Sequence, residues 1–221
     1  MSARGIAALR VAGKWCGIAA ALIVALAPPL SGEARIPAFE EIVRNLVSVN
    51  ASLQTFQVDQ VVDARVLIFR YRLQTTVYAA RPARYRVVVH NPPWFLRPIG
   101  DVFAHSGRPE DLLVNYAPRA VAWRMDGSRP ILWLDLGRQF STVNPPGVEA
   151  FVDPGRWLVE RLALHYEWGS VFAEPRYESV GGFLLPSAAS VRVPRFGLEA
   201  ALAYQNYRLN VFFPDSMFAR K

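Results

Sequence analysis

The sequence predicts an α+β domain in which antiparallel strands are covered on one face by an N-terminal helix. Apolar residues recur every three or four positions from Pro37 to Leu53, which is the spacing of one helix face. After that segment they alternate with polar residues, as in strands with one buried face. Pairs suited to tight turns, Ser106-Gly107, Asp126-Gly127 and Gly181-Gly182, separate the strand-like segments.

The first 34 residues have the pattern of an export signal. Three basic residues within the first 14 precede a nearly continuous apolar run, which begins at Cys16 and stops at Pro28-Pro29, and small residues lead up to Ala34. We therefore expect cleavage near Ala34, a mature chain from Arg35 and a periplasmic protein. A retained membrane anchor is the alternative, but the run is shorter than the ~20 residues of a spanning helix.

Cys16 is the single cysteine of the chain. It precedes the apolar run, whereas a lipid-modified cysteine would follow such a run and open the mature protein. Cleavage would leave residues 35–221 without a thiol, so neither a disulfide framework nor a cysteine metal site is expected there. Their length fits one domain with a single hydrophobic core, here expected to be a monomer.

The positive charge of the chain is modest and dispersed. The net charge is +7, and without the first 34 residues 22 basic and 17 acidic residues remain, a net charge of +5. Nearly all basic residues are arginines, spread one or two at a time along strand-like segments, which argues against a nucleic-acid partner. A solvated protein face explains this pattern; attraction to anionic lipid head groups is the alternative.

The mature domain is expected to open with a helix that ends near Leu53-Gln54. Pro37 suits its first turn, and Glu40 and Glu41 lie where the helix dipole favours acidic side chains. One stripe is apolar, and the opposite side, which includes Asn45 and Asn50, is polar, so the apolar stripe must pack on the sheet. The stripe consists of Phe39, Ile42, Val43, Leu46, Val49 and Leu53.

Strands and one further short helix are expected after it. Residues 154–166 place Trp157, Leu158 and Leu162 at mixed helical spacing, which indicates a second helix. The strand-like segments are residues 67–74, 84–89, 121–126, 185–193, 198–204 and 207–212.

The residues of catalytic chemistry are sparse. His90, His105 and His165 are isolated, and none has the spacing of a metal ligand pair. No serine lies in the small-residue elbow of a hydrolase, and the glycines are too dispersed to hold a phosphate. We expect no enzyme activity, cofactor or metal; a Ser-His-Asp set assembled from distant positions is the alternative that the sequence leaves open.

Several segments, in this order, resemble the periplasmic lipoprotein-carrier superfamily typified by LolA and LolB. Its members share an N-terminal amphipathic helix and an Arg-Pro pair that closes an early strand, here Arg81-Pro82. The similar segments cover nearly the whole mature chain: residues 77–85 with that pair, 103–118 with the Ser106-Gly107 turn, and the C-terminal stretches 182–186, 198–204 and 212–218.

The resemblance implies a curved, unclosed β-barrel whose dry cavity holds acyl chains. It also implies that Arg81 points inward and fastens lid elements through bonds from its guanidinium to backbone carbonyls. Taken alone, Arg81 is an exposed strand-end arginine, and the sheet could pack solidly on the helix with no cavity. The cavity candidates are the inner-face residues Leu67, Phe69, Tyr71, Leu73, Val87 and Trp123.

One segment departs from the family outline. Residues 91–98 hold three prolines together with Trp94 and Phe95, and read as an inserted extended loop. This loop is either a rim that contacts a membrane or partner, or a packed surface loop.

Two functions follow as hypotheses. The first is a non-enzymatic periplasmic carrier of a lipoprotein acyl moiety or a free lipid, working between an inner-membrane exporter and an outer-membrane acceptor. The second is an envelope sensing or protein-interaction module on the same scaffold, without transport.

Overall fold

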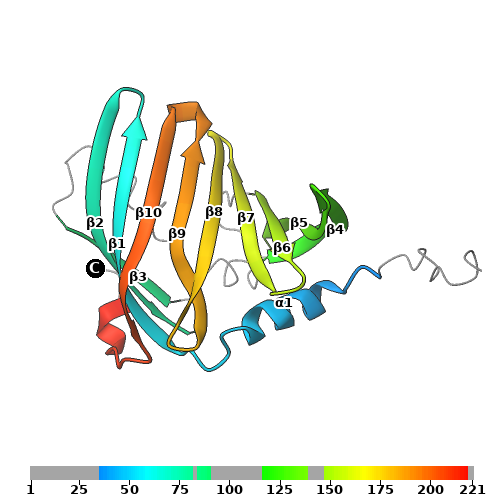
Figure 1. The fold of residues 1–221 in the computed structure, drawn as a ribbon, viewed down its shortest axis with the longest axis horizontal. Helices are drawn as coiled ribbons and strands as arrows, with labels where there is room; N and C mark the ends of the chain where they lie inside the picture. The colour runs from blue at the N-terminus through cyan, green and yellow to red at the C-terminus, as the bar shows by residue number, and fades with distance from the viewer. Residues whose placement is uncertain (1–34, 82–83, 91–115, 139–146, 219–221) are drawn as a thin grey trace, which may run out of the picture. The chain divides into compact units, whose positions relative to one another are not determined.

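The described part of the computed structural model comprises residues 35–81, 84–90, 116–138 and 147–218. From Ile36 onward the chain forms one compact unit. Its ten strands make one antiparallel sheet in the order β3-β2-β1-β10-β9-β8-β7-β6-β5-β4. The end strands β3 and β4 do not pair with each other, and the sheet curves strongly (Figure 1). This architecture confirms the predicted α+β fold with an unclosed half-barrel.

Helix α1 spans Phe39–Ser48. The strands are β1 Thr55–Val66, β2 Phe69–Ala80, β3 Arg84–His90, β4 Tyr116–Asp126, β5 Arg129–Arg138, β6 Gly147–Asp153, β7 Leu158–Tyr166, β8 Gly169–Val180, β9 Phe183–Val193 and β10 Leu198–Leu209, with single 3-10 turns η3 at Pro194–Phe196 and η4 at Asp215–Phe218. The turns predicted at Asp126-Gly127 and Gly181-Gly182 are confirmed, and the three glycines have positive φ. The pair Ser106-Gly107 lies outside the described residues.

The predicted second helix at residues 154–166 is wrong. The chain turns at residues 154–157 and then forms β7, which lies between β6 and β8. Both faces of this strand are covered, because neighbours such as Leu162 and Ala163 are both buried. A strand buried on both faces loses the alternation that identifies it in a sequence.

The last two predicted strands are a single strand, β10. The pairing of β10 with β1 shifts register opposite Gln57 and Asp59, and Asn206 takes the left-handed conformation with φ 54°. This is a bulge, which bends the strand and interrupts its alternation. The sequence pattern therefore breaks where the strand continues.

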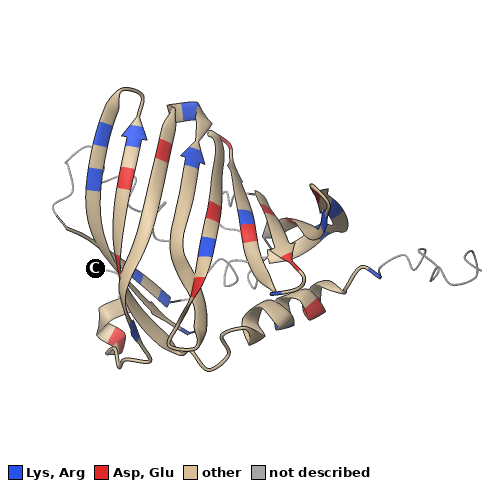
Figure 2. Ribbon diagram, in the orientation of Figure 1, with Lys and Arg blue, Asp and Glu red and all other residues tan. Residues whose placement is uncertain are grey.

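The core lies between α1 and one face of the sheet. Ile42 and Leu46 of α1 are 0% and 3% exposed, as the predicted stripe requires, and Leu53 is fully buried beyond the helix end. No helix in the described ranges is long and apolar enough to span a membrane. On the visible strands acidic and basic residues are interspersed (Figure 2).

Candidate functional site

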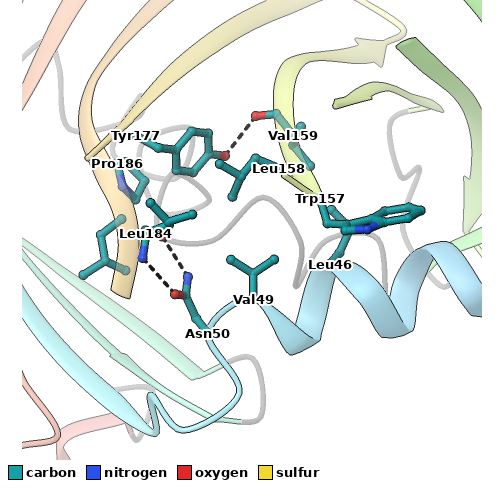
Figure 3. Close-up of a pocket in the computed structure, with 10 residues that line it drawn as sticks. Leu46, Val49, Asn50, Trp157, Leu158, Val159, Tyr177, Leu184 and Pro186 are labelled. Carbon is teal, nitrogen blue, oxygen red and sulfur yellow. Dashed lines mark hydrogen bonds between the residues drawn. The ribbon is translucent and has the colours of Figure 1, made fainter. Parts of the chain in front are cut away.

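The candidate site is an apolar seam where the C-terminal end of α1 meets the first residues of β7 and β9 (Figure 3). Apart from the amide of Asn50 and the hydroxyl of Tyr177, its side chains are hydrocarbon or aromatic. We call it the seam; its residues are Leu46, Val49, Asn50, Trp157, Leu158, Val159, Tyr177, Leu184, Leu185 and Pro186.

The seam is nearly filled by these side chains. Its free volume is about 10 Å³, which is at the lower limit for a single water molecule. The Tyr177 hydroxyl, the polar group of one wall, donates to the carbonyl oxygen of Val159 at 2.9 Å (Figure 3). The seam in this structure therefore has no room for a ligand larger than a water molecule.

Asn50 joins the segment after α1 to β9. Its Nδ2 donates to the Leu184 carbonyl at 2.8 Å, and its Oδ1 accepts from the Leu184 N–H at 3.0 Å (Figure 3). Asn50 is 6% exposed, so the two bonds are shielded from water. The expectation that Asn50 lies on the polar side of the helix is wrong, because α1 ends at Ser48.

Arg81 approaches the same end of α1 from the end of β2. Its Nη2 donates to the Asn50 carbonyl at 2.9 Å and, more weakly, to the Val47 carbonyl at 3.5 Å. Its backbone N–H donates to the Gln54 carbonyl at 2.9 Å. The last turn of α1 has no basic residue of its own, so Arg81 supplies the cation that the carbonyl end of a helix favours. These are guanidinium-to-carbonyl bonds of the kind that the resemblance implied.

One hydrogen-bond donor of the Arg81 guanidinium has no partner within the part of the chain that the structure describes. Its Nε is buried and has no hydrogen-bond partner among the described residues. A buried donor without a partner costs about 1–3 kcal/mol. The contact between Arg81 and the end of α1 therefore combines stabilising hydrogen bonds with a local penalty.

The wall residue Trp157 is positioned by the turn between β6 and β7. Trp157 has φ 53°, and its N–H donates to the Asp153 carbonyl at 2.8 Å. The Asp153 carboxylate accepts from the Gly155 N–H and from Arg156 Nε, each at 2.8 Å. Burial acts to raise the pKa of Asp153, but the bonds from Arg156 and Gly155 outweigh it and the pKa is lowered. The ionised carboxylate thus holds the turn.

The predicted cavity residues do not line the seam. Leu67 lies in the turn between β1 and β2 and is 66% exposed, and Phe69, the first residue of β2, is 56% exposed. Tyr71 is half-buried and stacks on Phe69 at 6.4 Å between ring centroids. Leu73 is buried in the core, and the half-buried Val87 and Trp123 pack against that core from β3 and β4, the two opposite edges of the sheet. Trp94 and Phe95 lie outside the described residues.

A row of polar side chains crosses β6, β7 and β8, and the sequence did not predict it. His165 Nδ1 is 2.9 Å from Ser170 Oγ, and its Nε2 is 3.1 Å from Glu149 Oε1. The other Glu149 oxygen accepts from Trp133 Nε1 at 3.1 Å. His165 and Ser170 are direct cross-strand partners, so the row has the form of a cross-strand network.

A second hollow, of about 350 Å³, is polar. It adjoins the β10 bulge, where the Asp59 carboxylate accepts from Thr76 Oγ1 and from Asn206 Nδ2, each at 3.1 Å. Thr76 Oγ1 also lies 2.9 Å from His90 Nε2. A lining of this kind is unsuited to hydrocarbon. In the described ranges no group of three or more His, Cys, Asp or Glu residues could hold a metal ion.

No protein-family model matches the sequence, and no curated protein matches it. Solved structures do match. A LolA superfamily protein from Nitrosomonas europaea is 12% identical, with a TM-score of 0.56 over 83% of this chain and 98% of that one. The chain has a LolA-like fold. A candidate outer membrane lipoprotein-sorting protein domain from Vibrio parahaemolyticus is 8% identical, with a TM-score of 0.63 over 82% and 97% of the two chains. A DUF1329 family protein from Desulfovibrio piger is 13% identical, with a TM-score of 0.58 over 82% and 95%.

Proposed function

We propose that this protein is a non-enzymatic periplasmic carrier that binds the acyl moiety of a lipoprotein, or a free lipid, between α1 and the sheet. The observation that carries the proposal is the fastening of α1 across an apolar seam by Asn50 and Arg81. On this proposal the arrangement is the closed form of a lid. An exporter in the inner membrane would load the carrier, and an acceptor at the outer membrane would unload it.

The hydrogen bonds that hold α1 on the sheet and the burial of an acyl chain involve free energies of similar size. Two bonds from Asn50 and two from the charged Arg81 contribute roughly 4–6 kcal/mol in total, since a neutral bond contributes about 1 kcal/mol and a charged one somewhat more. Each buried acyl methylene contributes about 0.8 kcal/mol. Roughly five to eight methylenes therefore offset the closed bonds. A ligand of this length can open the lid by its preference for the open state.

The second candidate is a sensing or protein-interaction module on the same scaffold. The small free volume of the seam favours it, because a sheet filled by its own helix needs no lipid for stability. Co-purifying lipid separates the two candidates. A native mass spectrum of the mature protein, isolated without detergent, should contain lipid if the protein is a carrier.

Binding of a fluorescent acyl-chain probe tests the lid directly. Arg81→Leu should keep the fold by circular dichroism but raise the rate of probe uptake, because the closed state loses its charged bonds. The matched control is Arg192→Leu, which removes an exposed arginine that pairs with Glu174 at 3.2 Å and lies outside the seam. The control should take up the probe like the parent protein.

A charge inside the seam should block uptake. Val49→Glu places a carboxylate among apolar side chains, where it is costly, and should reduce probe binding at least tenfold. Val43→Glu is the control, because Val43 is also a half-buried valine but lies within α1 and outside the seam. Folded Arg81→Leu and Val49→Glu variants that both bind the probe like the parent would disprove the carrier and leave the interaction module.

A further inference from the structure

Exposed apolar side chains gather at one end of the sheet. Ile68 is 85% exposed, Leu67 66%, Phe69 56% and Phe196 51%. They lie in the turn from β1 to β2, at the start of β2 and in η3, with the half-buried Trp168 of the β7–β8 turn beside them. We call these five residues the apolar rim.

The turns of the apolar rim contact one another. The Leu67 N–H donates to the Gly197 carbonyl at 3.3 Å, and a Cβ built on Gly197 would lie 3.1 Å from Leu67 Cδ2. The Phe196 ring lies 5.4 Å from the Trp168 ring, which stacks on Tyr166 at 4.7 Å. Three connections between different strands therefore form one continuous apolar surface.

The β1–β2 turn contains bulky apolar residues where tight turns usually have glycine, asparagine or other small polar residues. Leu67 has φ 54°, a conformation that glycine or asparagine adopts with less strain. Ile68 and Phe69 follow it although neither is buried. Apolar residues that break a local rule without contributing to the core indicate a use outside the fold.

Arginines flank the apolar rim. Arg65, Arg70 and Arg195 are exposed, and none forms an ion pair with a carboxylate of the described residues. Figure 2 shows blue at the upper ends of β1 and β9 and in the connection from β9 to β10. Three acidic residues lie near this end: Asp63, which pairs with Arg72 at 3.5 Å, Glu167, and Glu199, which is opposite Arg65 in the β1–β10 pairing. Against Glu167 and Glu199, the three arginines leave an excess of one positive charge.

We propose that the apolar rim is a membrane-contact surface that inserts into the head-group region of an anionic phospholipid bilayer. Exposed aliphatic and aromatic side chains beside arginines have the composition of a surface that lies in a bilayer interface. The rim does not depend on the proposed seam function. β7 starts at the seam and ends at Tyr166 beside the rim, about 30 Å away by strand rise.

Vesicle flotation tests the proposal with the mature protein. The parent protein should float with vesicles of phosphatidylcholine and phosphatidylglycerol, and less with phosphatidylcholine alone or at high salt. The triple variant Ile68→Ser, Phe69→Ser and Phe196→Ser should lose about tenfold in binding for each side chain removed. The control is Met125→Ser with Phe212→Ser, because these side chains are 67% and 90% exposed and lie outside the rim. The control should bind like the parent.

Further variants separate charge and folding from the apolar contribution. Arg70→Gln with Arg195→Gln should reduce the preference for phosphatidylglycerol but not the weaker binding to phosphatidylcholine. If circular dichroism shows that the triple variant is misfolded, Ile68→Ser alone should still reduce binding about tenfold.

Three results would overturn the proposal. The first is a parent protein that does not float, and the second is a folded rim variant that binds like the parent. The third is self-association, measured by ultracentrifugation, that needs the rim while vesicle binding does not. Uptake of the acyl probe in solution should be unchanged in the rim variants, so failure here is distinguishable from failure of the carrier.

Discussion

The seam and the apolar rim lie at opposite ends of the same strands. Apolar side chains are buried at the seam and exposed at the rim. At the seam Leu46 and Leu185 are 3% and 1% exposed, and polar bonds from Asn50 and Arg81 enclose them. At the rim Ile68 is 85% exposed. One end of the sheet therefore contributes stability and the other offers apolar surface. The difference indicates that substitutions at the two ends should separate stability from surface binding.

Leu46→Ala should have the largest effect on the free energy of unfolding. Leu46 is 3% exposed in the core beneath α1, so truncation leaves a cavity and should cost about 2–5 kcal/mol in a denaturant titration. Asn45→Ala, at a half-buried neighbouring position, should cost little. Equal costs at the two positions would show that α1 does not pack on the sheet through its apolar stripe.

Asn50→Ala should have the next largest effect on the free energy of unfolding. It leaves the half-buried N–H and carbonyl of Leu184 without their Asn50 partners, at a cost of about 1–2 kcal/mol. Hydrogen exchange of α1 should become faster, since the segment after the helix loses its bonds to β9. The control is Ser48→Ala, because the Ser48 hydroxyl is bonded only within α1, to the Asn45 carbonyl. Unchanged exchange in Asn50→Ala would contradict a role for Asn50 in holding α1.

The pH dependence of stability should reveal the smaller contribution of Asp153. Its pKa is lowered in the folded state, so its stabilising effect is complete above the ordinary value of 3.8 and is lost as the pH falls through the lower folded-state value. At neutral pH Asp153→Asn should cost about 1 kcal/mol or less, because the arginine partners are 44% and 54% exposed. The difference from the parent should shrink in acid.

The control for Asp153 is Asp215→Asn, since Asp215 is 90% exposed although it also pairs with an arginine. It should change stability little at any pH. A difference for Asp153→Asn that grows as the pH falls would contradict the assigned direction of the shift.

Ile68→Ser should have the smallest effect on stability, within about 0.5 kcal/mol, because an exposed side chain contributes little to folding. Denaturant titration of this variant beside Leu46→Ala tests the contrast between the two ends directly. A loss of 2 kcal/mol or more would place Ile68 in the folded core rather than on a free surface.

Much of the fold could be predicted from local pattern. The α1 stripe, the strand periodicity and two glycine turns led to the α+β class, and the resemblance led to the unclosed sheet. The pattern failed at β7, where consecutive positions on both faces are buried, and at the bulge that Asn206 forms in β10. In these two places tertiary contacts decide which residues are buried. The spacing of apolar residues along the sequence therefore does not identify the strand.

The candidate site was less predictable. The contact of Arg81 with carbonyls near the end of α1 was expected from the resemblance, whereas Asn50 was assigned to the wrong environment. Leu67 and Phe69 were chosen because the sequence pattern places them on a strand face with Leu73; Phe69 does belong to that strand, whereas Leu67 lies in the turn before it. Their exposure follows from their place in the β1–β2 turn and at the start of β2, where no element covers the strand face.

The sequence by itself determined where the helix and most strands form, because periodicity and turn residues act over a few neighbouring positions. Only the tertiary structure decided at which ends of those strands the apolar side chains are buried and at which they are exposed. Asn50 and Leu184 are 134 positions apart, and Leu67 meets Gly197 across the sheet. Such contacts depend on the order of strands in the sheet, and a hydrogen bond or an exposed patch exists only once that order has brought its residues together.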